Sequence, residues 1–126
     1  MVRLLVDSNV FIDYWKNPGE AATKTFMHNE IAICGVVKME LLRGSKNEKE
    51  FYEIKRALDC FDVLEFETSD WEEAAKLFIE LKSRGVVVPF QDGLISYLAL
   101  KNHCEIWTRD NHFKLIKVVK PELMLF

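Results

Sequence analysis

The sequence is poor in the residues that would indicate several classes of protein. Of its 126 residues, 5 are glycine, 3 are proline and 3 are cysteine, and 17 Lys and Arg against 20 Asp and Glu give a formal net charge of −3. The cysteines form no CxxC pair, which argues against a zinc site and predicts buried thiols in a reducing cytosol. No apolar run approaches the roughly 18 residues of a membrane span, and none resembles a signal peptide, so we expect a cytoplasmic protein. Without a basic excess, non-specific duplex binding is disfavoured.

The composition that is present is typical of a folded domain. Hydrophobic residues make up 49% and charged residues 29% of the chain, and the mean hydropathy is −0.04. Repeats and low-complexity segments are absent. This length and balance predict one domain over residues 1–126, large enough to bury a core.

Short apolar runs and longer helical patterns alternate along the chain. The predicted strands are residues 2–6, 31–34, 62–66 and 106–108, with a last strand drawn from 115–119 and 122–125. The predicted helices are a short one around 11–15, then 20–28, 36–42, 47–60, 71–84 and 91–102, with 86–89 as a loop. The alternation predicts the α/β class, a three-layer α/β/α arrangement around a mainly parallel sheet, with ligand sites beyond the carboxyl ends of the strands.

Four acidic residues map to that edge of the predicted sheet. Asp7 follows the first strand and Asp110 the fourth, while Glu40 lies in the helix after the second strand. Asp92 lies in the first turn of its helix, where free N–H groups and the helix dipole favour a carboxylate that stays charged at neutral pH.

Carboxylates gathered at one edge repel each other, a cost that a bound cation offsets. Oxygen ligands alone favour Mg²⁺ or Mn²⁺. With 20 acidic residues in the chain, each acid taken singly is equally compatible with a helix cap or a solvated charge. The fold is predicted from hydrophobic periodicity and not from the acids, yet it brings all four acids to one edge of the sheet. This agreement is what indicates a metal site.

Four segments carry a resemblance to a known family. Residues 7–12 (DSNVFI), 39–44 (MELLRG), 89–95 (PFQDGLI) and 108–113 (TRDNHF) resemble, in order and spacing, the sequence blocks of PIN-domain ribonucleases. The likeness runs over essentially the whole chain, and small members of this kind resemble the VapC toxins of toxin–antitoxin pairs. The resemblance implies a PIN-like fold, Mg²⁺- or Mn²⁺-dependent cleavage of RNA, a partner antitoxin and frequent homodimers. Two departures are Gly93, where alanine is common, and Ser8, where threonine is frequent.

The resemblance assigns roles position by position. Asp7, Glu40, Asp92 and Asp110 take the places of the acidic quartet, and Ser8 and Thr108 those of the hydroxyl residues beside it. We expect metal-assisted hydrolysis, with Asp7 and Asp92 as central ligands and Glu40 and Asp110 completing the set. The two hydroxyls would hold carboxylates or waters in place.

The remaining candidates concern substrate and partner. Cations beside the quartet that could contact an RNA backbone are Arg43, Lys38 and Arg109, of which Arg43 shares a helix face with Glu40. The aromatic residues Tyr14, Trp15, Phe26, Phe51 and Tyr52 form either a groove for an antitoxin segment or ordinary core. The three histidines show no ligand spacing and are expected at the surface or at helix edges: His28, His103 and His112.

Other classes of protein require residues that this sequence has only in part. An aspartate-nucleophile phosphatase needs a second Asp two places after Asp7, where Asn9 stands, and a receiver domain needs an acidic pair before its acceptor. A non-catalytic module that binds RNA or protein is an alternative that the four intact acids argue against, and a housekeeping RNA-processing nuclease is another alternative. Exonucleolytic or DNA-directed cleavage remains open, because no residue pattern reports recognition of a 2′-hydroxyl.

Overall fold

A five-stranded parallel sheet forms the centre of the computed structural model, which describes residues 2–126. The strands lie in the order β3-β2-β1-β4-β5. Their bounds are β1 Arg3–Val6, β2 Glu30–Cys34, β3 Asp62–Leu64, β4 Glu105–Trp107 and β5 Met124–Leu125. The predicted parallel sheet is confirmed, with β1 in its middle.

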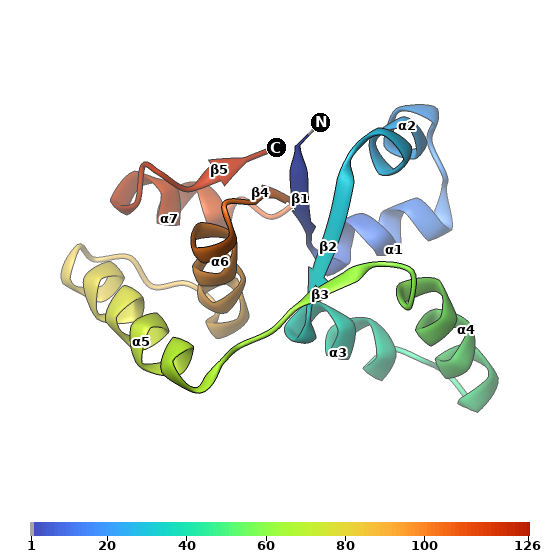
Figure 1. The fold of residues 1–126 in the computed structure, drawn as a ribbon, viewed down its shortest axis with the longest axis horizontal. Helices are drawn as coiled ribbons and strands as arrows, with labels where there is room; N and C mark the ends of the chain where they lie inside the picture. Colours follow the sequence, from blue (N-terminus) through green and yellow to red (C-terminus); the bar gives the residue numbers. More distant parts are fainter. Residues whose placement is uncertain (1) are drawn as a thin grey trace.

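Seven helices connect the strands. They are α1 Ser8–Lys16, α2 Glu20–His28, α3 Gly35–Arg43, α4 Glu48–Leu58, α5 Thr68–Ser83, α6 Phe90–Asn102 and α7 His112–Val119. The chain steps from β1 outward to β3 and then returns to β4 and β5 on the other side of β1, so right-handed crossovers place α1–α4 on one face and α5–α7 on the other. Figure 1 shows these two groups on opposite sides of the sheet. The predicted three-layer α/β/α arrangement is confirmed.

The core lies where the strands are covered on both faces. Leu4, Leu5 and Val6 of β1 are fully buried, as are Ile33 of β2 and Ile106 of β4. A strand buried on both faces has an uninterrupted apolar run in place of an alternating one, which is why these segments were recognisable in the sequence.

The predicted last strand is wrong over residues 115–119, which belong to α7. The β-branched residues of this segment suggested a strand, but Phe113, Ile116 and Val119 recur every third residue and are buried on one face, while Val118 is 78% exposed. Within 122–125, only Met124 and Leu125 form a strand. Tertiary burial of one helical face decided the conformation.

Two smaller features complete the fold. The loop predicted over 86–89 is confirmed, and Gly85 precedes it with a φ of 75°, a left-handed conformation that favours glycine after a helix. Cys34 and Cys104 are buried as predicted, whereas Cys60 is exposed. Among the described residues, no helix is long and apolar enough to cross a membrane.

Candidate active site

The candidate site lies where the direction of the crossovers reverses, between β1 and β4. In open parallel sheets, such a switch point leaves a crevice at the carboxyl ends of the two neighbouring strands. Asp7 directly follows β1 and Asp110 follows β4, while Glu40 comes from α3 and Asp92 from the first turn of α6. We call Asp7, Glu40, Asp92 and Asp110 the acidic cluster.

Asp7 is held by several donors at the end of β1. Its backbone N–H donates to the Trp107 carbonyl at 2.9 Å, which extends the pairing of β1 with β4 by one residue. Its carboxylate accepts the Ser8 N–H at 2.8 Å, the Thr108 hydroxyl at 2.7 Å and the Asn9 amide at 3.2 Å. The side chain is therefore fixed in place and 4% exposed.

The hydroxyls of Ser8 and Thr108 connect members of the acidic cluster, as the family pattern predicts. The Ser8 hydroxyl donates to Glu40 Oε1 at 3.4 Å, which links α1 to α3. Thr108 Oγ1 donates to Asp7 and accepts the Asp110 N–H at 3.0 Å, so one hydroxyl positions the side chain of one acid and the backbone of the other.

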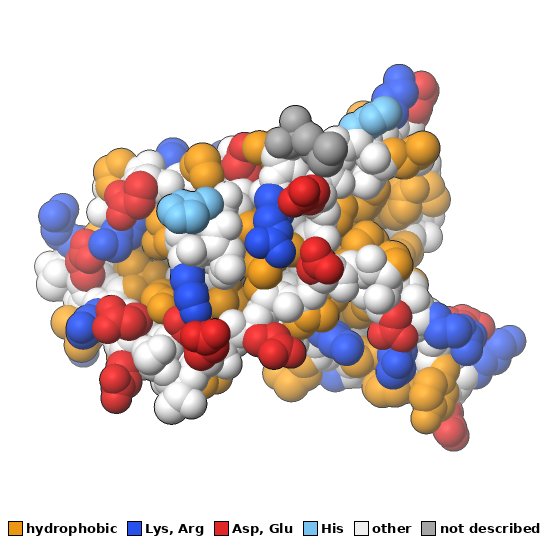
Figure 2. Space-filling model, viewed as in Figure 1, with side chains coloured by type: hydrophobic (Ala, Val, Ile, Leu, Met, Phe, Trp, Pro, Cys, Tyr) orange, Lys and Arg blue, Asp and Glu red, His pale blue; other side chains and the backbone are white. Residues whose placement is uncertain are grey.

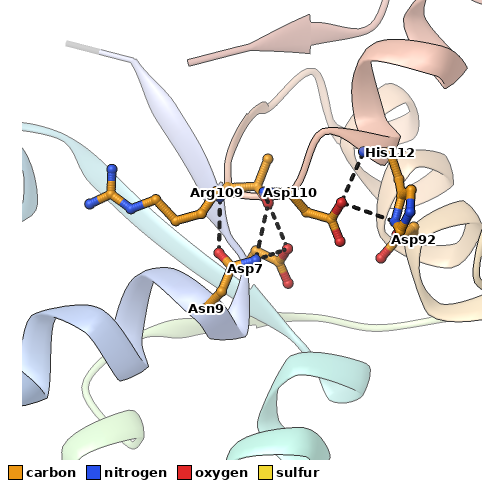
Figure 3. A network of polar contacts seen from close by, with 7 residues as sticks. Asp7, Asn9, Asp92, Arg109, Asp110 and His112 are labelled. Carbon is orange, nitrogen blue, oxygen red and sulfur yellow. Dashed lines mark hydrogen bonds and ion pairs between the residues drawn. The ribbon is translucent and has the colours of Figure 1, made fainter.

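Asp92 and Asp110 meet at a histidine that the sequence analysis placed at the surface. His112 Nδ1 lies 3.1 Å from Asp92 Oδ2 and 2.9 Å from Asp110 Oδ1. Figure 3 shows the three side chains next to one another. One ligand atom from each of these three residues lies within 4.8 Å of the others. His112 is the first residue of α7 and its side chain is 46% exposed, so its predicted place at the surface and at a helix edge is confirmed. Its contacts with two acids of the cluster were not predicted.

Burial and mutual repulsion both disfavour the charged forms of the cluster. Desolvation raises the pKa of Asp7 and of Glu40. The charge of Asp110 raises the pKa of Asp7 further, and the charge of Asp7 raises that of Glu40. Burial raises the pKa of Asp92 to about 6, with a further contribution from Asp110. The N-terminal turn of α6 therefore does not lower this pKa, because loss of solvent outweighs the helix dipole.

The cations named from the sequence lie at the border of the site. Arg43 is exposed, and its charge partly lowers the pKa of Glu40, so the two side chains share one side of α3 as expected. Lys38 is half-buried in a groove with Met39. The Arg109 guanidinium lies 3.4 Å from Asp13 Oδ2 and is thereby turned toward α1.

Two neighbours of the site were not assigned roles from the sequence. Asn9 takes part through both ends of its amide: its nitrogen donates to Asp7, and its oxygen accepts the Arg109 N–H at 3.0 Å. Gly93 is explained by packing, because a Cβ there would come within 2.2 Å of the Phe78 ring on α5. The contacts of Asn9 with Arg109 and of Gly93 with Phe78 have no local signal, since each joins residues distant in the chain.

The residues present fit a divalent cation. Asp7 and Asp92 are each 4% exposed, and among the described residues neither carboxylate forms an ion pair with lysine or arginine. Buried carboxylates without a cationic partner are costly, and hard divalent ions prefer carboxylate oxygens. Asp92, Asp110 and His112 are the closest group of ligand atoms, while Asp7 and Glu40 adjoin it through hydroxyl contacts.

Known proteins share both the sequence pattern and the fold. Ribonuclease VapC1 of Methanocaldococcus jannaschii is 24% identical over 116 residues, which cover 91% of this chain and 82% of that protein. The structure of DNA-bound VapBC from Salmonella typhimurium matches with a TM-score of 0.85 at 22% identity, over 100% of this chain and 98% of that one.

A further structure, VapBC2 from Rickettsia felis bound to a DNA fragment from their promoter, matches with a TM-score of 0.82 at 21% identity, over 98% of this chain and 97% of that one. These likenesses confirm the PIN-like fold. The pattern of the PIN domain matches residues 4–119. Because this match spans nearly all of a 126-residue chain, the resemblance found in the four sequence segments is confirmed, and the chain belongs to the PIN domain family.

Proposed function

We propose that this chain is a VapC-like toxin, an endoribonuclease that depends on Mg²⁺ or Mn²⁺. The observation that carries the proposal is the pair of buried carboxylates, Asp7 and Asp92, that lie at the switch point of the sheet without a lysine or arginine partner among the described residues. The name of the Methanocaldococcus relative supports ribonuclease activity, and the VapBC structures support a toxin–antitoxin context.

The proposed roles follow from the contacts of each side chain. Asp7 and Asp92 are the central metal ligands, and Glu40 and Asp110 complete the set. When bound, the ion lowers the pKa of a water and stabilises negative charge on the phosphate. Thr108 keeps Asp7 in its orientation through the 2.7 Å hydrogen bond, and Ser8 restrains Glu40. In this proposal the four acids bind the metal, and the two hydroxyl residues hold acids in position.

Substrate contacts in this proposal come from the few cations around the site. On the face shown in Figure 2, positive and negative side chains are interspersed and no broad basic area is present. The net charge of the chain is −3 as well, so RNA binding should depend on individual contacts to the phosphates on either side of the cleaved bond. Arg43 is the best placed, because it is exposed and lies on the side of Glu40, while Lys38 and Arg109 are further candidates.

The proposed antitoxin contact is an aromatic cavity of about 180 Å³ between α1, α2 and α4. Three of the five aromatic residues expected to form a groove line it, namely Tyr14, Trp15 and Phe26. Trp15 is 41% exposed, so its ring is accessible to an apolar side chain from a partner segment. Phe51 lies elsewhere, in the groove beside Met39 and Arg43. A homodimer is part of the proposal on the strength of the family resemblance.

The test is cleavage of single-stranded RNA by purified protein, with Mg²⁺ or Mn²⁺, with EDTA, and with Asp92→Asn as a matched variant. We expect cleavage inside the chain of a circular RNA, which has no ends for an exonuclease, and its complete loss in EDTA or in the variant. Cleavage that persists in excess EDTA would contradict metal dependence. Binding of RNA without cleavage under every metal condition would instead indicate a non-catalytic module.

A further inference from the structure

His112 extends the site beyond its carboxylates. It is the first residue of α7, and Figure 3 shows its ring beside Asp92 while its backbone N–H faces Asp110. That N–H donates to Asp110 Oδ1 at 2.9 Å, so Asp110 fixes the start of the helix that carries the ring. Asp110 thus both positions the ring of His112, through the backbone, and contacts its Nδ1 atom.

The spacing of the three side chains is that of ligands around one ion. Two ligand atoms about 2.1 Å from a metal and at right angles to each other are about 3 Å apart. His112 Nδ1 lies 2.9 Å from Asp110 Oδ1 and 3.1 Å from Asp92 Oδ2. The structure therefore brings one nitrogen and two oxygens to distances at which a single cation could contact all three.

The surroundings of Asp92 differ from those of Asp7 in a way that supports this arrangement. The carboxylate of Asp7 accepts three hydrogen bonds from the protein. Among residues 2–126, His112 is the only hydrogen-bond partner of the Asp92 carboxylate, although that side chain is 6% exposed. His112 itself is 46% exposed, so an ion can enter from solvent and water can occupy its remaining positions.

We propose that His112 Nδ1 is a metal ligand, so that Asp92, Asp110 and His112 form a mixed nitrogen and oxygen site for a divalent transition metal, with Mn²⁺ bound more tightly than Mg²⁺. This rests on the metal dependence in the proposed function. Imidazole nitrogen favours transition metals, whereas Mg²⁺ favours oxygen ligands and keeps its waters. In the metal-free protein Nδ1 donates its proton to the carboxylates, which only accept when ionised. On metal binding this proton passes to solvent, and the ring keeps a proton on Nε2 and offers the Nδ1 lone pair.

The direct test is pulsed electron paramagnetic resonance of the wild-type protein loaded with one equivalent of Mn²⁺. We expect modulation from a coordinated imidazole nitrogen, which isotopic labelling of histidine with ¹⁵N shifts. His112→Gln should abolish the modulation, and His28→Gln, a change at the exposed end of α2, should leave it intact. Absence of nitrogen coupling in the wild-type protein would overturn the proposal without any variant.

Calorimetric titration gives the second readout. His112→Gln should weaken Mn²⁺ binding by at least about tenfold while changing Mg²⁺ binding by no more than about twofold. Equal loss for both ions, or tighter binding in the variant, would show that His112 acts only as a hydrogen-bond partner that competes with the ion. Circular dichroism of the variant checks that α7 is still folded.

This inference and the proposed function fail differently. Nitrogen coupling in a protein that cleaves no RNA under any metal condition would refute the ribonuclease and leave the His112 site standing. Metal-dependent cleavage without nitrogen coupling would leave the ribonuclease standing and refute the role of His112.

Discussion

Two buried aspartates, Asp70 in α5 and Asp92 in α6, show how differently a carboxylate can be accommodated. Asp70 is 3% exposed and accepts hydrogen bonds from Tyr97 at 2.7 Å, Lys101 at 2.7 Å and the Glu67 N–H at 2.8 Å. These donors lower the pKa of Asp70 to about 2. Asp92 is 4% exposed, but its neighbours are another carboxylate and a histidine, and its pKa rises to about 6.

Similarly low exposure therefore has opposite consequences for the pKa: at Asp70 the hydrogen-bond donors outweigh the loss of solvent, whereas at Asp92 the loss of solvent outweighs the single histidine partner. Asp70 forms the capping box of α5 and joins α5 to α6, so its charge contributes to the fold. In the described part of the chain, Asp92 has no lysine, tyrosine or backbone donor that stabilises its charge, so its charged form is suited to binding a cation. We call Asp70 with Glu67, Tyr97 and Lys101 the Asp70 network.

The largest expected effect separates activity from stability. Asp92→Asn should lower RNA cleavage at least about a hundredfold. Mutation of residues that only hydrogen-bond to a metal ligand already lowers activity about 10- to 100-fold, and Asp92 is proposed as a ligand itself. Asp70→Asn should keep most of the activity and lower the melting temperature by several degrees. Cleavage rates and thermal unfolding of both variants measure this. Loss of activity in Asp70→Asn at unchanged stability would contradict the distinction between a structural Asp70 and a functional Asp92.

The next effect is on the pH dependence of the metal-free protein. The folded-state pKa of Asp92 is raised to about 6 from an ordinary value of 3.8, so between these values the folded state holds more protons than the unfolded state. Protonation of Asp92 therefore stabilises the folded state by on the order of 2 kcal/mol below about pH 4, and this stabilisation is lost as pH rises through 6. The lowered pKa of Asp70 acts in the opposite sense, with stability lost as pH falls through about 2.

Urea unfolding in EDTA between pH 4 and 8 measures this second effect. The free energy of unfolding should decline with rising pH in the wild-type protein and much less in Asp92→Asn, which at pH 7 should be more stable by roughly 0.5 to 2 kcal/mol. A strong destabilisation of Asp92→Asn in EDTA would show that Asp92, like Asp70, is a structural acid.

A smaller effect is expected from the hydroxyl that orients Asp7. Thr108→Val keeps the size of the side chain and removes the 2.7 Å hydrogen bond to Asp7 and the acceptor for the Asp110 N–H. RNA cleavage should fall about tenfold or somewhat more. The matched control is Thr25→Val, where the hydroxyl bonds only to the backbone of its own helix. Equal activity in the two variants would exclude a positioning role for Thr108.

The smallest effect concerns substrate binding alone. Arg43→Ala should weaken RNA binding and reduce the slope of its salt dependence by about one unit, leaving Mn²⁺ affinity nearly unchanged. Arg56→Ala, an exposed arginine in the last turn of α4, is the matched control. Fluorescence anisotropy at several salt concentrations gives the slope. Equal loss of Mn²⁺ affinity would identify Arg43 as a structural cation of the site.

The sequence was informative where a signal is local. Asp7 could be placed because it ends an uninterrupted apolar strand, and Asp92 because it opens a helix. The contact of His112 with Asp92 could not be predicted, because it joins residues 20 positions apart and depends on how α7 begins. The contribution of desolvation to the pKa of Asp92 could not be predicted either, because it is set by tertiary packing.

The same limit explains the error in the last predicted strand and the silence on Asp70. Residues 115–119 have strand-like side chains, and only the burial of Ile116 and Val119 against the core favours a helix. Asp70 caps the start of α5, but its partners Tyr97 and Lys101 lie on another helix. Side chains that a distant element satisfies leave no pattern in the neighbouring sequence.

Thermal unfolding with EDTA and with Mn²⁺ tests the central claim most directly, namely that the acidic cluster is completed by a cation and the Asp70 network is not. Wild-type protein and Asp70→Asn should both gain about 2.7 kcal/mol at a Mn²⁺ concentration a hundredfold above the dissociation constant, and Asp92→Asn should gain little. Equal gains in all three proteins, or none in the wild type, would contradict the claim.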